Sequence, residues 1–188
     1  MKKILIIFLF FQVPANSQNL VNTYFAGGCF WCMEESFEKI EGVIEVVSGY
    51  SGGTTENPTY KDVTYGDTGH FETVKITYDS EILNYQKILS SYWKNIDPFD
   101  AAGQFCDKGY SYRSVAFYKN IEQKKAIEKS VKEIELRFNK KVITYIRKFD
   151  KFYEAESYHQ DYYQENFVNY LMYKNACGRE KTLNKIWN

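Results

Sequence analysis

Apolar residues alternate with polar ones in some segments of the chain and recur every three or four positions in others. Alternation is typical of a half-buried strand, and the longer spacing is typical of a helix with one apolar face. The first six elements follow in the order βαββαβ, which is the split-βαβ arrangement. The pattern predicts strands at 21–26, 43–47, 71–78, 113–118 and 142–146, and helices at 29–40, 81–96 and 121–138.

The predicted helix at 121–138 has clear local signals. Asn120 precedes it, and asparagine is a favourable N-cap residue because its side chain accepts a hydrogen bond from the first turn. The apolar residues of this helix share one face. The four residues on this face are Ile127, Val131, Ile134 and Phe138.

The first residues of the chain have the pattern of a cleavable secretory signal. Lys2 and Lys3 precede an apolar run at 4–11, and small residues follow at Ala15 and Ser17. The run is shorter than the ~20 residues that a permanent membrane span needs, so we expect no stable membrane anchor. A buried N-terminal strand is the alternative. We predict a signal peptide at 1–17 and an exported, periplasmic protein, in which disulfides can form.

The rest of the chain, 18–188, is long enough for one domain with a substantial core. No linker or internal repeat divides it. An aromatic stretch at 152–167 fits either a short helix or an ordered loop near the end of this domain. We therefore expect a single catalytic domain, and we expect it to be a monomer.

Charge gives no indication of a polyanionic or membrane partner. The chain has 24 lysine and arginine residues and 24 aspartate and glutamate residues, and no run of one sign stands out. Nucleic-acid and membrane-surface binding usually require a basic patch. We therefore exclude a nucleic-acid partner and look for chemistry in particular residues.

The most informative motif is the run from Gly27 to Cys32, which places Cys29 where a predicted strand meets a predicted helix. The unpaired N–H groups and the dipole at a helix N-terminus favour a thiolate, the nucleophilic form of cysteine. Phe30 and Trp31 would supply an apolar pocket beside the thiol. A small buried core residue after a glycine turn is the alternative.

A carboxyl group falls on the apolar face of a predicted strand. Alternation through 71–78 places Glu72 with Val74, Ile76 and Tyr78. Burial disfavours the charged form, so the pKa of Glu72 should rise and the residue could serve as a general acid. In the alternative, Glu72 lies at a frayed strand start and reaches water.

Two loops, at 48–69 and 97–112, interrupt the regular pattern and contain further polar candidates. Tyr60 and Tyr112 could donate phenolic hydrogen bonds, and Asp107 could accept one. His70 and His159 do not form a compact ligand pattern with the cysteines, so we predict no metal site. Their residue types alone indicate these roles, and the alternative is that loop tyrosines simply cover the edge of a core.

Four segments, taken in order, resemble the A-type peptide methionine sulfoxide reductases. The similarity covers about residues 22 to 165. It implies an α+β fold, a ferredoxin-like two-layer sandwich with additional helices and long loops. The matching segments are Gly28-Cys29-Phe30-Trp31, Asn57-Pro58-Thr59-Tyr60, the run from Gly66 to Glu72, and the run from Asp107 to Ser114.

The resemblance implies that Cys29 attacks the sulfur of the S epimer of methionine sulfoxide while Glu72 protonates the departing oxygen, helped by Tyr60 and Tyr112. Cys29 would become a sulfenic acid, which condenses readily with a second thiol. A thioredoxin-like donor or a periplasmic thiol relay would then reduce the disulfide, with no cofactor and with oxidised proteins as substrates. The resemblance also implies binding roles: Phe30 and Trp31 at the S-methyl group, and Asp107 at the substrate amide.

Three cysteines are candidates to resolve the sulfenic acid at Cys29. We favour Cys177, because a C-terminal tail can move to the nucleophile. Cys32 lies one helical turn from Cys29 and could close a C-x-x-C disulfide instead. Cys106 adjoins Asp107, and we expect it mainly to pack near the site.

Two other classes of function remain open. A general thiol-disulfide oxidoreductase could use Cys29 and Cys32, which have the redox C-x-x-C spacing. Such an enzyme would not need Glu72. The second alternative is a non-catalytic binding module held together by disulfides.

Overall fold

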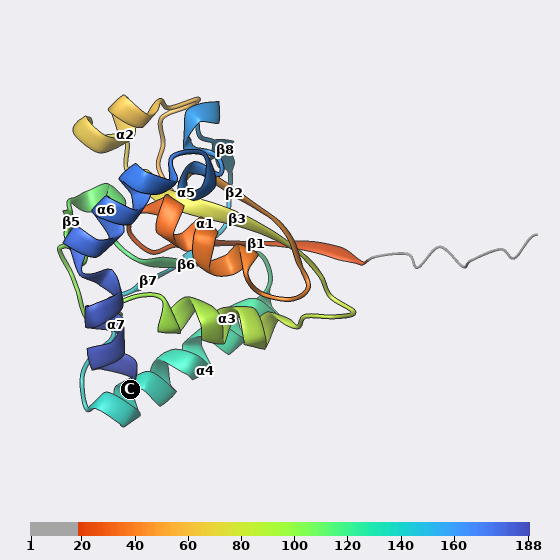
Figure 1. Cartoon of the computed structure of the whole chain (residues 1–188). Coiled ribbons are helices and arrows are strands. Elements are labelled where there is room, and N and C mark those ends of the chain that lie inside the picture. The colour runs from red at the N-terminus through yellow and green to blue at the C-terminus, as the bar shows by residue number, and fades with distance from the viewer. Residues whose placement is uncertain (1–18) are drawn as a thin grey trace, which may run out of the picture.

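The computed structural model describes residues 19–188, and its central element is a six-stranded sheet (Figure 1). The predicted signal at 1–17 lies outside the described residues. The strands of this sheet are β1 (Leu20–Ala26), β2 (Val43–Ser51), β3 (Phe71–Asp79), β6 (Val115–Tyr118), β7 (Tyr145–Lys148) and β8 (Phe152–Glu154). Their order is β7-β6-β1-β3-β2-β8, and only the pair β6 and β7 is parallel. A short hairpin, β4 (Gly103–Gln104) and β5 (Asp107–Lys108), lies apart from it.

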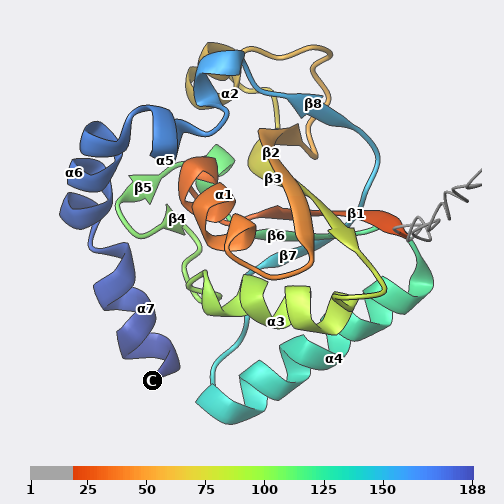
Figure 2. The ribbon, with the colours of Figure 1, turned by 45° about the vertical axis from the view of Figure 1, so that its right-hand side comes forward.

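Helices cover the sheet and extend along one side of the molecule. They are α1 (Phe30–Glu38), α2 (Tyr60–Tyr65), α3 (Tyr85–Lys94), α4 (Ile121–Phe138), α5 (Tyr162–Glu165), α6 (Phe167–Cys177) and α7 (Arg179–Trp187). Helices α6 and α7 run down one side, from the level of α1 to the end of α4 (Figures 1 and 2). Within residues 19–188, no helix combines the length and apolar character that crossing a bilayer requires.

The predicted order βαββαβ and the α+β fold are confirmed. The elements β1, α1, β2, β3, α3 and β6 form this order along the chain. In the sheet, the four strands lie in the order β6-β1-β3-β2, which is the ferredoxin-like arrangement. Helix α4 has its predicted bounds, and the Asn120 side chain accepts a hydrogen bond from the backbone N–H of Gln123 at 2.8 Å. Strong local signals therefore placed this element correctly.

Other predicted bounds are wrong by several residues. Helix α3 begins later than expected, because the side chain of Asn84 caps it by accepting from the backbone of Lys87. The last predicted strand, at 142–146, is displaced toward the C-terminus, since β7 takes its register from parallel pairing with β6. The stretch at 152–167 divides into β8, a 3₁₀ turn (Ser157–His159) and α5.

The two faces of the sheet are packed differently, as strand alternation requires. On the helical side, Phe25 stacks on Tyr92 of α3 with ring centroids 4.3 Å apart. On the opposite side, the neighbouring Tyr24 stacks on Phe149 at 3.7 Å. Helices α1, α3 and α4 contribute to the larger core, so α1, which follows the first strand, is fixed along its length. This rigid helix begins at the candidate site.

Candidate active site

A tight turn between β1 and α1 fixes the position of Cys29. Gly28 has a left-handed backbone with φ 79°, and an added Cβ there would lie 2.6 Å from the Cβ of Gln104. Only glycine fits such a position without strain. Cys29 is the N-cap of α1, and its carbonyl accepts hydrogen bonds from the N–H groups of Cys32 and Met33. The sequence thus places the thiol at the start of a helix, as predicted.

One small cavity of about 70 Å³ brings the predicted site residues together. Seven of its eight lining residues are those that the sequence analysis selected, and the eighth, Tyr173, comes from α6. A larger groove of about 380 Å³ between α3, α4 and α7 contains no cysteine, and we therefore place the chemistry in the smaller cavity. The lining residues are Cys29, Phe30, Trp31, Tyr60, Glu72, Asp107, Tyr112 and Tyr173.

Glu72 is buried beside the start of α1, with 2 % of its surface exposed. The frayed-strand alternative is therefore wrong. Its Oε2 accepts a hydrogen bond from the backbone N–H of Phe30 at 3.0 Å. Burial raises the pKa of Glu72 to about 8, against the opposing effect of this hydrogen bond. The carboxyl group consequently remains mostly protonated at neutral pH, as the alternation pattern indicated.

The thiols of Cys29 and Cys32 are buried together, with 5 % and 3 % of their surfaces exposed, and Tyr170 of α6 packs on them. Burial raises the pKa of Cys29 well above its ordinary value. A hydrogen bond from Cys29 lowers the pKa of Cys32 to about 7. Burial and the neighbouring Cys32 therefore oppose the effect that the helix N-terminus has on Cys29, and the thiolate at Cys29 stays a prediction.

Two tyrosines complete the polar wall of the cavity. Tyr60 begins α2, where Thr59 and Asp62 form a capping box, and Tyr112 ends the 3₁₀ turn Tyr110–Tyr112. Burial, and after it the charge that Glu72 can carry, raises the pKa of both phenols. Both hydroxyl groups are therefore protonated and able to donate hydrogen bonds near Glu72.

The apolar wall is formed by Phe30 and Trp31. The indole of Trp31 stacks on the ring of Tyr162, with centroids 3.8 Å apart and 12° between the planes. Its Nε1–H donates a hydrogen bond to Nδ1 of His159 at 3.2 Å. The sequence analysis considered His159 only as a metal ligand and missed this contact, because the two residues are separated by 128 positions.

Helix α6 closes the cavity from the side of Asp107. The hydroxyl of Tyr173 donates a hydrogen bond to Oδ2 of Asp107 at 2.6 Å. The same helix is attached to α1, because Tyr170 and Lys174 both bind the carboxylate of Glu35. The sequence analysis did not select Tyr173. The only sequence feature that pointed to this segment was Cys177, which lies four residues after it.

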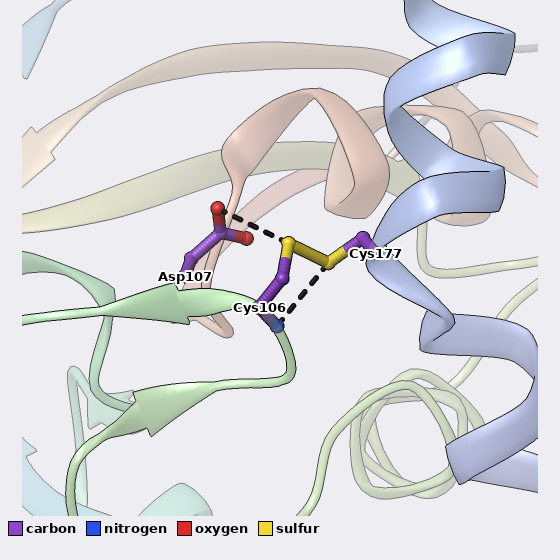
Figure 3. A group of neighbouring side chains, drawn as sticks. All are labelled: Cys106, Asp107 and Cys177. Carbon is purple, nitrogen blue, oxygen red and sulfur yellow. Dashed lines mark hydrogen bonds between the residues drawn. A yellow bond between two sulfur atoms is a disulfide. The ribbon is translucent and has the colours of Figure 1, made fainter.

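Cys106 and Cys177 form a disulfide outside the cavity, between the β4–β5 hairpin and the last residue of α6 (Figure 3). Cys106 is exposed and Cys177 is partly exposed, so the expectation that Cys106 mainly packs is wrong. The Asp107 carboxylate lies beside the bonded sulfurs, but these sulfurs are bonded to each other and cannot serve as thiolate ligands. Within residues 19–188, the free cysteines are Cys29 and Cys32.

Comparisons with known proteins identify the family of this chain. A sequence model of the family described as "Peptide methionine sulfoxide reductase" matches residues 21–188. The peptide methionine sulfoxide reductase MsrA of Listeria monocytogenes serotype 4a is 48 % identical over 172 residues, covering 90 % of this chain and 97 % of that protein. Mxr1 of Saccharomyces cerevisiae, in reduced form, has a TM-score of 0.74 at 27 % identity over 80 % of this chain and 87 % of that one. Methionine sulfoxide reductase A of Corynebacterium diphtheriae gives 0.72 at 25 % identity, covering 80 % and 77 %.

Proposed function

The chain belongs to the peptide methionine sulfoxide reductase family, and on this basis we propose that it reduces the S epimer of methionine sulfoxide, free or in proteins, to methionine. One observation carries the proposal: the nucleophile candidate Cys29 and the protonated carboxyl of Glu72 open into the same cavity. A sulfoxide oxygen leaves readily only when it is protonated, and a carboxyl that stays neutral at pH 7 can supply that proton.

The first step transfers oxygen from the substrate to Cys29. The Cys29 sulfur attacks the sulfoxide sulfur, and its proton passes to the thiolate of Cys32, with which it already shares a hydrogen bond. Glu72 gives a proton to the sulfoxide oxygen, and the hydroxyls of Tyr60 and Tyr112 donate to the same atom. The S–O bond then breaks and the hydroxyl group passes to the Cys29 sulfur, while the new S–S bond breaks and leaves its electron pair on the substrate sulfur. The substrate, reduced by two electrons, leaves as methionine, and Cys29 becomes a sulfenic acid.

Binding uses the two walls of the cavity. Phe30 and Trp31 hold the S-methyl group by apolar contact, which selects a methyl over a charged or hydrated group. Asp107 accepts a hydrogen bond from the backbone amide of the substrate. Because Tyr173 donates to Oδ2 of Asp107 in the structure, the substrate amide competes with this phenol for the carboxylate.

We assign the second step to Cys32, whose free thiol lies against Cys29. It attacks the sulfenic sulfur, and water leaves as the disulfide between Cys29 and Cys32 forms. Cys177 is bonded to Cys106, and its thiol becomes available only after that disulfide is reduced. The sequence-based assignment of Cys177 as the resolving residue therefore stays a prediction for the fully reduced protein.

A thioredoxin-like dithiol donor regenerates the enzyme by reducing the disulfide, and the reaction needs no cofactor. If the signal at 1–17 is cleaved, the mature protein works as a periplasmic monomer and receives electrons through a thiol relay there. Cell fractionation tests this location. Recovery of the protein only from the cytosol would contradict it.

Mass spectrometry after one equivalent of methionine sulfoxide tests the reaction and the order of the cysteines. Two starting forms are used, one with the Cys106–Cys177 disulfide intact and one fully reduced. We expect one methionine per protein and a bond between Cys29 and Cys32 in the first form. A link from Cys29 to Cys177 in the second form would confirm the earlier assignment.

The Glu72→Gln variant separates this function from general thiol-disulfide exchange by Cys29 and Cys32. Disulfide exchange between thiols requires no protonation of an oxygen, so it should continue in the variant. Sulfoxide reduction should be lost. Equal retention of both activities would contradict the proposal.

A further inference from the structure

His159 lies directly behind the apolar wall of the cavity without lining it. Its ring is buried, with 2 % exposed. It packs on three of the cavity residues, with ring centroids 4.5 Å from Tyr60, 5.0 Å from Phe30 and 5.6 Å from Trp31. A single side chain therefore supports both the apolar wall and one of the phenols.

The hydrogen bond between Trp31 and His159 fixes the protonation state of the histidine. An indole N–H can only donate, so Nδ1 of His159 must carry no proton when it accepts this bond at 3.2 Å. The ring is then the neutral tautomer with its proton on Nε2. That atom is buried and has no hydrogen-bond partner among the described residues.

We infer that neutral His159 is the positioning residue that holds the Trp31 indole in place for substrate binding, and that protonation of His159 releases it. This inference rests on the proposed function. A proton on Nδ1 would place two N–H groups against each other at the Trp31 contact. The hydrogen bond would be lost and the indole would turn away from the substrate's methyl group.

The groups around His159 determine the pH at which it gains this proton. Burial lowers the pKa of His159, and the carboxylate of Glu156 opposes this effect. The phenols of Tyr60 and Tyr158 pack on the ring, and burial raises the pKa of both, so they stay neutral in acid. On α1, the contacts are the uncharged rings of Phe30 and Trp31. Release is therefore expected on the acid side of neutrality.

Substitution of His159 tests whether it positions Trp31, because a displaced indole should raise KM for methionine sulfoxide. In His159→Asn, the amide Oδ1 can take the place of Nδ1 as acceptor but does not titrate. The wild type should show KM for methionine sulfoxide rising roughly 3- to 10-fold toward acid pH, the size of one lost hydrogen bond. His159→Asn should show a flat KM, and His159→Leu should show the raised KM at all pH values with kcat changed less.

The indole proton resonance of Trp31, assigned with a Trp31→Phe variant, provides a readout that does not depend on activity. It should shift with acid pH in the wild type and remain fixed in His159→Asn, even if His159→Leu fails to fold. Identical pH dependence of this resonance and of KM in the wild type and His159→Asn would overturn the inference. Absence of sulfoxide reduction by the wild type would instead reject the proposed function.

Discussion

The two pairs of cysteines in this protein lie close to the same cavity but in opposite surroundings. Cys29 and Cys32 are free, buried and separated by one turn of α1. Cys106 and Cys177 are bonded, accessible, and separated by 71 residues. We call these the inner pair and the outer pair. The comparison indicates that reactivity and accessibility are divided between them, since a protein reductant can reach the outer pair while α6 covers the inner one.

Different parts of the fold hold each pair. The inner pair depends on α1, which is fixed by the sheet and the helical core. The outer pair joins two surface segments, the β4–β5 hairpin and the end of α6, over a long loop. Closing a loop of this length stabilises a protein by about 4 kcal/mol in the chain-entropy model. In the proposed function the inner pair therefore has the chemical role, while the disulfide of the outer pair ties α6 to the hairpin beside the cavity.

The strongest test of this division compares Cys29→Ser with Cys106→Ser. Removing a nucleophile typically lowers turnover by a factor on the order of 10⁶. We expect Cys29→Ser to lose sulfoxide reduction completely, because Cys29 is the only cysteine among the described residues that line the cavity. Methionine release in a single turnover is the measurement, and Cys106→Ser, which should still release one equivalent, is the control. Full activity of Cys29→Ser would assign the nucleophile to another residue.

The second test concerns the acid that serves the inner pair. Glu72→Gln keeps the shape of the side chain but cannot donate an acidic proton, and loss of a general acid typically costs about 10² to 10⁴ in rate. Because the pKa of Glu72 is raised to about 8, its neutral form is present below that pH and is lost above it. Wild-type kcat should therefore fall as the pH rises through about 8. This alkaline limb should be absent from the residual activity of the variant, and its persistence would show that another group titrates.

The contrast between the pairs also shows what the sequence can predict. The inner pair and Glu72 follow from local patterns: a glycine turn before a helix, and an acid on the apolar face of a strand. Each of these signals spans only a few consecutive residues. The local patterns selected these residues one by one, and the resemblance to a family placed them in one site, which the structure forms where the start of α1 lies beside the start of β3.

The outer pair could not be predicted in this way. Four cysteines allow three pairings, and only tertiary structure selects one. Helix α6 gave no clear periodicity, because apolar residues lie on its exposed side as well as on its buried side. The roles of Tyr173 and His159 were also missed, because each residue reaches the cavity through contacts between segments that are distant in the sequence. The exposed apolar residues of α6 are Phe167, Val168, Leu171 and Met172.

The third test removes the outer pair with Cys106→Ser, Cys177→Ser and the double variant. Loss of the disulfide should lower the free energy of unfolding by up to about 4 kcal/mol. With a small dithiol reductant, steady-state turnover should continue in all three variants if Cys32 resolves Cys29, as proposed. Urea denaturation measures the first effect and a coupled assay the second. Turnover that stalls after one equivalent in Cys177→Ser, but not in Cys106→Ser, would make Cys177 the resolving residue.

The smallest expected effect comes from Tyr173, which the outer pair holds in the cavity. In Tyr173→Phe the ring still packs, but the hydrogen bond to Oδ2 of Asp107 is lost. A substrate amide then no longer competes with the phenol, so KM for a peptide containing methionine sulfoxide should fall about 2- to 10-fold, the size of one net hydrogen bond. The value of kcat should change little, because the hydroxyl of Tyr173 competes for Asp107 in the closed form and is assigned no part in the proton transfer.

Free methionine sulfoxide serves as the matched substrate in this last comparison, because its charged amino group differs from the peptide amide that Asp107 is proposed to bind. A decrease in KM for the peptide alone would place the amide at Asp107 and identify Tyr173 as a competitor for it. A rise in KM for both substrates would instead mean that the Tyr173 hydroxyl itself binds the substrate. In that case α6 would be part of the binding site, and the outer pair would hold a functional wall of the cavity in place.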